Sequence, residues 1–197
     1  MTDAPAGLPP LHLATHLRVA QRLTMMVNRY DVTLADADGR PVGPPVAFAQ
    51  QKRLSMREQV TIYTDESGRT VLCSFRARQV FDVGATYDVL DGNGAPIGSF
   101  RKDFARSLLR STFHVEQPGA PAVVGQERSL LVALLRRAVD ELPLPIHFEF
   151  AAAGAPVMSV SRAFSLRDAY QVEIPAPWFD RRLAIALAIG LDALMGR

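Results

Sequence analysis

The sequence predicts a mainly β protein (α+β), in which a closed barrel of about twelve strands surrounds a hydrophobic C-terminal helix. One amphipathic helix is expected to pack against the outside of the sheet. Three observations lead to this prediction: a short strand motif recurs along the chain, turn signals follow most of its copies, and the C-terminal segment is almost wholly apolar. Closure is expected because a closed barrel leaves no strand edge exposed.

The recurring motif is an aromatic residue, a polar residue and an apolar residue. Its copies are Tyr30–Val32, Tyr87–Val89, Phe113–Val115, Phe148–Phe150 and Tyr170–Val172, with Val60–Tyr63 as a degenerate copy. Alternation with a period of two, in β-branched and aromatic residues, is typical of strands that bury one face. Each copy therefore predicts one strand of the barrel.

Turn signals follow most copies of the motif. They are Asp36–Gly39, Asp65–Gly68, Asp91–Gly94, Gln117–Gly119 and Ala153–Gly154. Acidic or amide residues beside glycine supply the capping side chains and the positive φ angles that tight hairpins require. A second strand is predicted after each turn, at Val46–Gln50, Val71–Arg76, Ile97–Arg101, Ala122–Gly125 and Val157–Ser161. Leu17–Leu23 opens the series and Tyr170–Ile174 closes it.

A predicted helix over Glu127–Leu142 interrupts the strands. Its leucines, including Leu130 and Leu134, fall on one helical face, and charged residues fall on the other. This pattern predicts an amphipathic helix that lies against the sheet and ends at Pro143. Its outer face is a candidate docking surface for a protein partner.

The C-terminal segment is the second interruption. Asp180 stands where a helix cap is expected, and Leu183–Leu191 is an uninterrupted apolar run of nine residues. A helix that is apolar on every side belongs in lipid or in a protein core. A bilayer span needs about 20 residues, and Asp192 would fall inside such a span. These facts favour a buried helix, with a membrane anchor as the alternative.

Length and composition indicate one domain. The chain has 197 residues with a net charge of +2, which is too balanced to indicate nucleic-acid binding. Residues 1–10 are rich in proline and small residues and are expected to be a disordered tail, followed by a single domain over 11–197. Cys73 is the only cysteine, so no intrachain disulfide is possible, and a cytoplasmic location is expected.

The sequence contains no pattern typical of an active site. His12 and His16 are four residues apart, but no glutamate follows His12 and no third metal ligand lies nearby. Cys73 alternates with Val71 and Phe75, which predicts that its thiol faces the core. Neither a nucleophile elbow nor a phosphate-binding loop is present. No catalytic residue, metal site or cofactor is expected, so the protein is interpreted as a non-enzyme.

One cluster of basic residues is a candidate binding site for anions. This basic group consists of Arg76, Arg78, Arg101, Lys102, Arg106 and Arg110. Residues 101–110 contain four bases and one acid, a net charge of +3. If both halves of the group emerge at one end of the barrel, their arginines would suit phosphate. Leu108 and Leu109 lie between the arginines and could contact a bilayer surface, whereas the alternative is an ordinary solvated rim.

The order of the motifs resembles a known superfamily. Leu17–Arg22 and Asn28–Val32 resemble its lead strand and its N-x-Y strand, and Asp65–Leu72 resembles its D-x-x-G hairpin. Asp91–Gly98 is similar to its G-x-x-I-G hairpin. Asp168–Pro175, leading into the apolar helix, is the closest match. Over roughly Leu11 to Met195 the chain resembles the Tubby C-terminal-like superfamily, within it the LURP-one-related and phospholipid scramblase families.

The resemblance implies a closed β-barrel around a central helix. It also implies possible roles at membranes: calcium-stimulated scrambling for scramblases and phosphoinositide binding for Tubby. Scramblase features are absent, since the cysteine cluster and the proline-rich arm are missing. Only Asp168 and Glu173 represent the acidic calcium segment, too few oxygens for a tight calcium site.

The function expected from these observations is a non-enzymatic module that binds anionic phospholipid head groups at a membrane surface. Such a protein would be cytoplasmic or peripheral to the membrane. The alternative is a soluble cytoplasmic scaffold domain that binds a protein partner through the Glu127–Leu142 helix and has no lipid activity.

Overall fold

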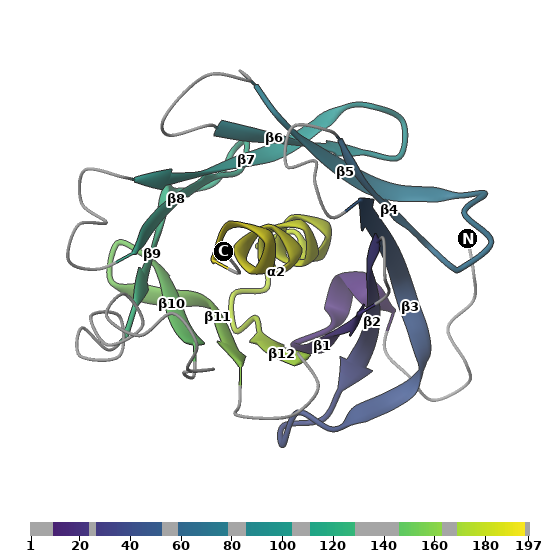
Figure 1. The fold of residues 1–197 in the computed structure, drawn as a ribbon. Helices are drawn as coiled ribbons and strands as arrows, with labels where there is room; N and C mark the ends of the chain where they lie inside the picture. Colours follow the sequence, from purple (N-terminus) through teal and green to yellow (C-terminus); the bar gives the residue numbers. More distant parts are fainter. Residues whose placement is uncertain are drawn as a thin grey trace.

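The computed structural model describes residues 10–23, 27–52, 59–78, 86–103, 111–128, 146–162 and 169–195. Twelve antiparallel strands close into a barrel in the order β1-β12-β11-β10-β9-β8-β7-β6-β5-β4-β3-β2 (Figure 1). The last strand closes the ring against the first, with Val19 of β1 opposite Tyr170 of β12. The predicted mainly β barrel is confirmed.

A short 3-10 turn at Leu11–Leu13 precedes the strands. The strands are β1 (His16–Leu23), β2 (Val27–Ala35), β3 (Pro41–Lys52), β4 (Val60–Tyr63), β5 (Val71–Ala77), β6 (Thr86–Asp91), β7 (Pro96–Asp103), β8 (Thr112–Glu116), β9 (Val123–Glu127), β10 (Ile146–Ala152), β11 (Ala155–Arg162) and β12 (Ala169–Glu173). Strand β3 begins earlier than alternation predicts. Its proline-rich first part pairs with β2 through register shifts beside Thr33.

The predicted turns form tight hairpins at one end of the barrel. Gly39, Gly94 and Gly154 have φ angles of +74°, +84° and +84°, a region that glycine enters without steric cost. The Asp36 carboxylate accepts the Arg40 backbone N–H at 2.8 Å. Each of these turns joins neighbouring strands with few residues, so this end is called the hairpin end.

The other ends of the strands lie at the opposite end of the barrel, here called the rim. Antiparallel pairing brings together there the strand ends that the remaining connections join, β1 with β2, β3 with β4, β5 with β6, β7 with β8, β9 with β10 and β11 with β12. Each of these connections includes residues outside the described ranges. Helix α2 (Arg181–Met195) passes through the barrel from the hairpin end toward the rim (Figure 1).

Helix α2 forms the centre of the core. Leu183, Leu187 and Ile189 are fully buried among the inward-facing side chains of the strands. Gly190 permits a close approach, because a Cβ atom there would lie 2.7 Å from the Phe100 ring. None of the helices in the described residues is long and apolar enough to cross a membrane. The predicted buried helix is therefore confirmed.

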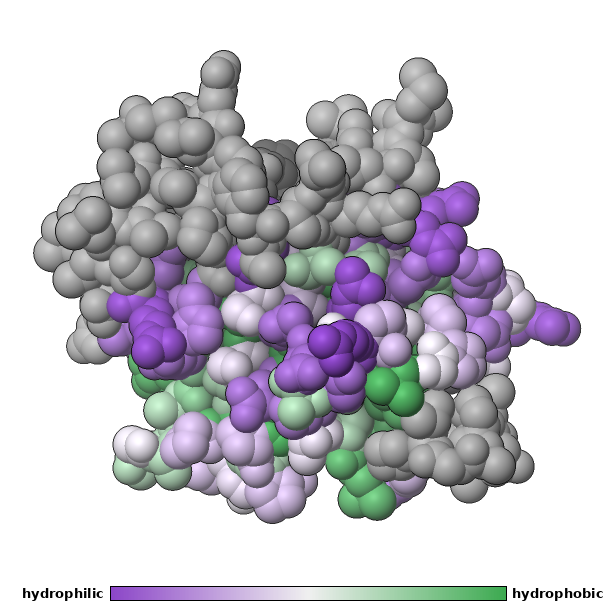
Figure 2. All heavy atoms as spheres, turned by 90° about the horizontal axis from the view of Figure 1, so that it is seen from below, coloured by the Kyte–Doolittle hydropathy of each residue, from purple (hydrophilic) through white to green (hydrophobic). Residues whose placement is uncertain are grey.

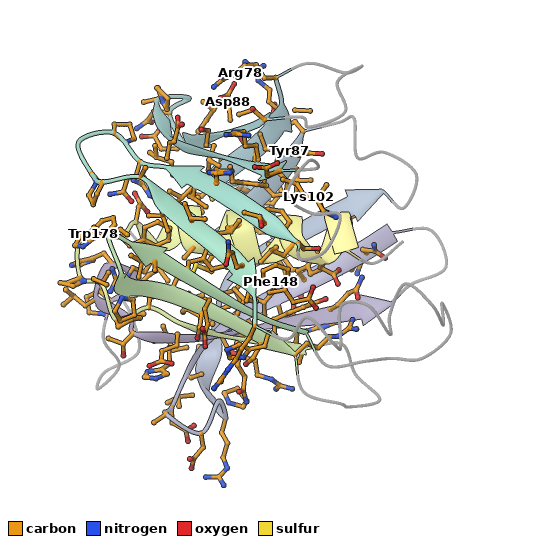
Figure 3. The ribbon with its side chains drawn as sticks, turned by 90° about the vertical axis from the view of Figure 1, so that its left-hand side faces the viewer. Arg78, Tyr87, Asp88, Lys102, Phe148 and Trp178 are labelled. Atoms are coloured by element: carbon orange, nitrogen blue, oxygen red, sulfur yellow. The ribbon has the colours of Figure 1, made fainter. Side chains whose placement is uncertain are left out.

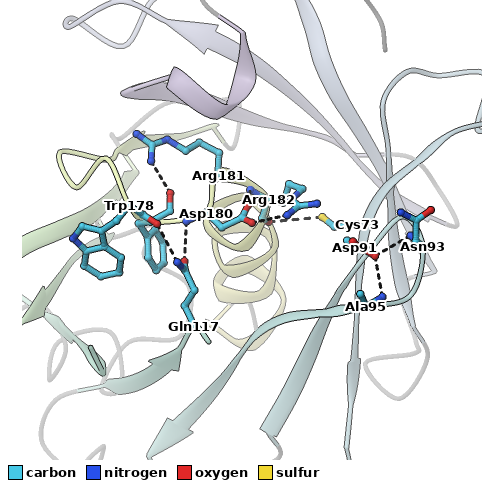
Figure 4. Close-up of polar contacts among 10 residues, drawn as sticks. Cys73, Asp91, Asn93, Ala95, Gln117, Trp178, Asp180, Arg181 and Arg182 are labelled. Atoms are coloured by element: carbon cyan, nitrogen blue, oxygen red, sulfur yellow. Dashed lines mark hydrogen bonds and ion pairs between the residues drawn. The ribbon is translucent and has the colours of Figure 1, made fainter. Parts of the chain in front are cut away.

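Hydrogen bonds fix the start of α2 to the hairpin end (Figure 4). The Asp180 carboxylate accepts the Arg182 backbone N–H at 2.8 Å, which confirms the predicted cap. Gln117, in the β8–β9 hairpin, accepts the Asp180 N–H at 2.8 Å and donates to the Trp178 carbonyl at 3.0 Å. The helix is thereby positioned against the sheet before its apolar part begins.

The guanidinium of Arg181 joins the two ends of the chain. It is 5% exposed and donates to the carbonyls of Ala14 at 2.8 Å, Ala176 at 3.1 Å, Pro177 at 3.0 Å and Phe179 at 2.6 Å. Burial lowers the pKa of Arg181, and the four carbonyls compensate for the lost hydration of its charge. This side chain is therefore structural.

The structure corrects the start of the predicted amphipathic helix. Glu127 is the last residue of β9, not the first residue of a helix. It continues the inward alternation of Val123 and Gly125 and is only 2% exposed. Residues 129–145 lie outside the described residues, as do residues 1–9 of the predicted tail.

Figure 2 shows the barrel face seen from below in Figure 1, where hydrophilic and hydrophobic residues are interspersed.

Candidate functional site

Half of the basic group lies on the outer wall where β5, β6 and β7 approach the rim. Arg76 of β5 is opposite Asp88 of β6. The Arg78 backbone N–H donates to the Thr86 carbonyl at 2.7 Å, and Thr86 is opposite Arg101 of β7. Arg78 and Arg101 therefore flank Thr86 in one cross-strand row, and Arg76 lies in the next row. The strand order therefore brings Arg76, Arg78 and Arg101 to the same end of the barrel.

The side chains of this cluster face away from the core. Phe75, Tyr87 and Phe100 are buried in the interior, and successive side chains of a strand point to opposite faces. Arg76 and Arg101 follow buried neighbours and are exposed. Arg76, Arg78 and Arg101 are together called the outer arginines.

Lys102 is not part of this surface. It has the same alternation as Phe100 and lies opposite the buried Phe113 of β8, so it faces the barrel interior near the rim and is half-buried. Figure 3 shows Lys102 toward the end of the barrel opposite Trp178. Arg106 and Arg110 lie outside the described residues.

One of the outer arginines, Arg78, is paired with an acidic neighbour. Arg78 donates to both carboxylate oxygens of Asp88, at 2.5 Å from Nη2 and 3.1 Å from Nε, and the two labelled side chains adjoin in Figure 3. The hydrogen bond from Arg78 lowers the pKa of Asp88. Arg76 and Arg101 form no ion pair with any described residue. They are the charges that remain available to an anionic partner.

A shallow groove runs along the outer wall beside the outer arginines. Its volume is about 440 Å³, and Arg78 and Asp88 are among the residues that line it. Gly98 and Ser99 of β7 and Gln117 in the β8–β9 hairpin also line it. Small side chains along the groove leave room for a ligand close to the backbone of β7.

Two tyrosines bind a buried carboxylate at the rim end of α2. The Tyr30 hydroxyl donates to Asp192 Oδ2 at 2.6 Å, and the Tyr170 hydroxyl donates to Oδ1. Burial, and then the Asp192 charge, raise the pKa of Tyr30, so its phenol remains a donor. The Arg162 guanidinium lies 5.9 Å from the centre of the Tyr170 ring. This cluster holds α2 to β2 and β12, and its role is structural.

Other candidate reactive groups are placed unfavourably for chemistry. Cys73 is fully buried, as predicted. Its Sγ lies 3.7 Å from the Arg182 carbonyl oxygen, and burial raises the pKa of the thiol to about 12. His12 lies in the 3-10 turn and His16 begins β1, so they share no helical face. In the described ranges, no three His, Cys, Asp or Glu residues are grouped to hold a metal ion.

A family model described as LURP-one-related matches residues 46–192, more than half of the chain. The chain belongs to the LURP-one-related family. The match begins within β3 and ends at Asp192, so it includes the buried part of α2. Comparisons with curated proteins and with solved structures gave no significant match.

Three features of this LURP-one-related protein could not be predicted from its sequence. The Arg78–Asp88 pair depends on the register of two strands, which the motif alone does not give. An aspartate in an apolar run, such as Asp192, predicts a buried hydrogen-bond partner. The sequence does not indicate that this partner is Tyr30. The four carbonyl groups that bind Arg181 belong to the backbone, so no side-chain motif predicts them.

Proposed function

We propose that this LURP-one-related protein is a non-enzymatic, cytoplasmic module that binds anionic phospholipid head groups at a membrane surface. The observation that supports the proposal is the position of Arg76 and Arg101. Both are exposed on one wall beside the rim, and neither forms an ion pair with a described residue. Arginine guanidinium groups bind phosphate in a bidentate geometry.

The proposed affinity is low and depends on charge. Each basic residue near an anionic membrane contributes about 1 kcal/mol, so Arg76 and Arg101 together give only about 2 kcal/mol. Arg78 adds less because it is paired with Asp88. Arg106 and Arg110, which lie outside the described residues, are proposed to extend this surface, whereas the inward-facing Lys102 is not part of it. Binding is therefore expected to be peripheral, reversible and weakened by salt.

The proposal also sets an orientation. The rim would face the membrane, because the outer arginines lie beside it, and the hairpin end would face away. Trp178 belongs to the segment between β12 and α2 at the hairpin end, and Figure 3 shows it at the opposite end of the barrel from Lys102.

Vesicle co-sedimentation tests the proposal. The wild-type protein should bind vesicles of phosphatidylcholine with phosphatidylserine, and not vesicles of phosphatidylcholine alone. The double variant Arg76→Glu, Arg101→Glu should lose most of this binding. The control is Arg18→Glu, Arg40→Glu, which makes the same charge change near the hairpin end. Equal binding to both vesicle types, or equal loss in both double variants, would contradict the proposal.

A second candidate function is a soluble protein-interaction module without lipid activity. The groove of about 440 Å³ lined by Arg78 and Gln117 supports it, and the part of the predicted helix that follows β9, outside the described residues, is proposed as a docking surface. A photo-crosslinking residue at Ala120, in the groove, should capture a defined partner in cells. The same residue at Ala37, in the exposed β2–β3 turn, should not, and equal capture at both positions would contradict this function.

A further inference from the structure

A second cavity lies at the hairpin end, away from the outer arginines. Its volume is about 480 Å³, and it is bounded by the β4–β5 hairpin, the β6–β7 hairpin and the first turn of α2. Its polar lining includes Thr64, Arg69, Thr70, Asp91, Asn93 and Arg182. We propose that this cavity binds a phosphate group between Arg69 and Arg182. The inference is independent of the proposed membrane function.

One edge of the Arg182 guanidinium can donate hydrogen bonds to such a ligand. Its Nε and Nη2 atoms donate to the two Asp180 oxygens at 3.1 Å and 2.7 Å (Figure 4). A guanidinium carries five N–H donors in a planar fork, so Asp180 occupies only one of its edges. Among the described residues, Nη1 has no hydrogen-bond partner. Asp180 therefore fixes the orientation of Arg182 and leaves donors for the cavity.

Arg69 supplies a second guanidinium that is less constrained. It is exposed, and its Nε donates to Ser67 Oγ at 3.3 Å. No carboxylate in the described part of the chain forms an ion pair with it. Two arginines on different walls of one cavity can bind a single phosphate from two directions, which favours a phosphate over a singly bound carboxylate.

The one acidic residue that lines the cavity is already engaged. Asp91 Oδ1 accepts the backbone N–H groups of Asn93 and Ala95, each at 2.9 Å (Figure 4). Its carboxylate thus stabilises its own turn. The lining contains two arginines and one carboxylate, and because Arg182 is paired with Asp180, Arg69 supplies the positive charge that is not in an ion pair.

Close packing of the two hairpins gives the cavity a fixed wall. A Cβ atom at Gly92 would lie 2.3 Å from the Val71 carbonyl oxygen, so only glycine allows the hairpins to approach this closely. The Thr70 hydroxyl and the Asn93 amide also line the cavity and can donate to phosphate oxygens. The site is therefore largely formed before a ligand arrives, which reduces the entropic cost of binding.

An NMR titration with glycerol 3-phosphate tests the inference. The perturbed backbone amides should lie at 64–72 and 91–95, and Arg69→Gln should weaken binding at least about ten-fold. Arg40→Gln, in the β2–β3 hairpin, removes the same charge away from the cavity and should leave affinity unchanged. Absence of saturable binding, or equal affinity in Arg69→Gln and the wild type, would overturn the inference.

Two further measurements are needed. One distinguishes a lipid head group from a soluble phosphate compound, and the other distinguishes this inference from the proposed membrane function. If soluble dihexanoyl phosphatidic acid binds more tightly than glycerol 3-phosphate, the ligand is a lipid head group. If glycerol 3-phosphate binds more tightly, the ligand is a soluble metabolite. Either order of affinity supports a phosphate site. The double variant Arg76→Glu, Arg101→Glu should keep its affinity for glycerol 3-phosphate. Loss of that affinity would overturn the inference, whereas failed vesicle binding alone would not.

Discussion

The carboxylate of Asp192, near the end of α2, accepts a hydrogen bond from the hydroxyl of Tyr30 in β2 at 2.6 Å. The two residues are 162 positions apart in the sequence, and Tyr170 of β12 donates to the other carboxylate oxygen. Because β12 closes the barrel against β1, this cluster joins the helix to the strands on both sides of β1. It explains how one acidic residue is accommodated in a largely apolar core.

Removal of the Tyr30 hydroxyl should destabilise the protein. Tyr30→Phe leaves the buried Asp192 oxygen without its donor, and a loss of about 1–3 kcal/mol in the free energy of unfolding is expected. Urea denaturation measures this change. Tyr63→Phe is the control, since Tyr63 is only half-buried and its hydroxyl has no hydrogen bond to a described residue. Equal losses in the two variants would argue against the role of Asp192.

The same hydrogen bond should make stability depend on alkaline pH. Burial and the Asp192 charge raise the pKa of Tyr30 above the ordinary value of 10.0, so the unfolded chain releases this proton at a lower pH than the folded protein. The contribution of Tyr30 is complete below about pH 10 and falls above it by about 1.4 kcal/mol per pH unit. The stability difference between wild type and Tyr30→Phe should therefore shrink from pH 9 to pH 11, and a constant difference would contradict the assignment.

The Arg78–Asp88 pair should be detectable as a lowered pKa of the Asp88 carboxyl group. The hydrogen bond from Arg78 lowers the pKa of Asp88, so Arg78→Gln should raise it toward the ordinary value of 3.8. Arg76→Gln should have a smaller effect, because Arg76 acts on Asp88 through charge alone. Carbon-13 NMR of the side-chain carboxyl measures both. The pair's small contribution to stability should be present above about pH 4 and be lost as the pH falls through the lowered pKa.

The close contact between α2 and β7 should not tolerate an added methyl group. A Cβ atom at Gly190 would lie 2.7 Å from the Phe100 ring, so Gly190→Ala should cost about 1–3 kcal/mol through overpacking. The gain in helix propensity of about 1 kcal/mol offsets part of this cost. Adding Phe100→Leu should recover part of the stability in a double-mutant cycle. If Gly190→Ala stabilised the protein, the helix would not be packed against Phe100 as described.

Much of the fold follows from local patterns in the sequence. Alternation identifies the strands, and acidic or amide residues near glycine identify most of the turns. The run over Leu183–Leu191 is too short for a bilayer and too apolar for a surface. Alternation also separates Arg101 from Lys102, because consecutive residues of a strand face opposite sides. Grouping the bases by their distance in the sequence misses this separation.

The remaining features depend on contacts between distant segments. The pairing of Arg78 with Asp88 requires the register of β5 against β6, and the cavity between Arg69 and Arg182 requires two hairpins and a helix to meet. No spacing rule in the sequence gives either arrangement. The helix predicted from Glu127 begins too early, since Glu127 continues the alternation of β9 and is held in the ladder with β10.

The central functional claim is that the rim, with its outer arginines, faces an anionic membrane. Trp178 is the only tryptophan of the chain and lies at the hairpin end, where it is 40% exposed. Its fluorescence can therefore be measured on phosphatidylserine vesicles that carry brominated acyl chains, with acrylamide as a soluble quencher. If the rim faces the membrane, the protein should bind these vesicles while Trp178 is not quenched by bromine and remains accessible to acrylamide. Strong bromine quenching of Trp178, or no binding at all, would contradict it.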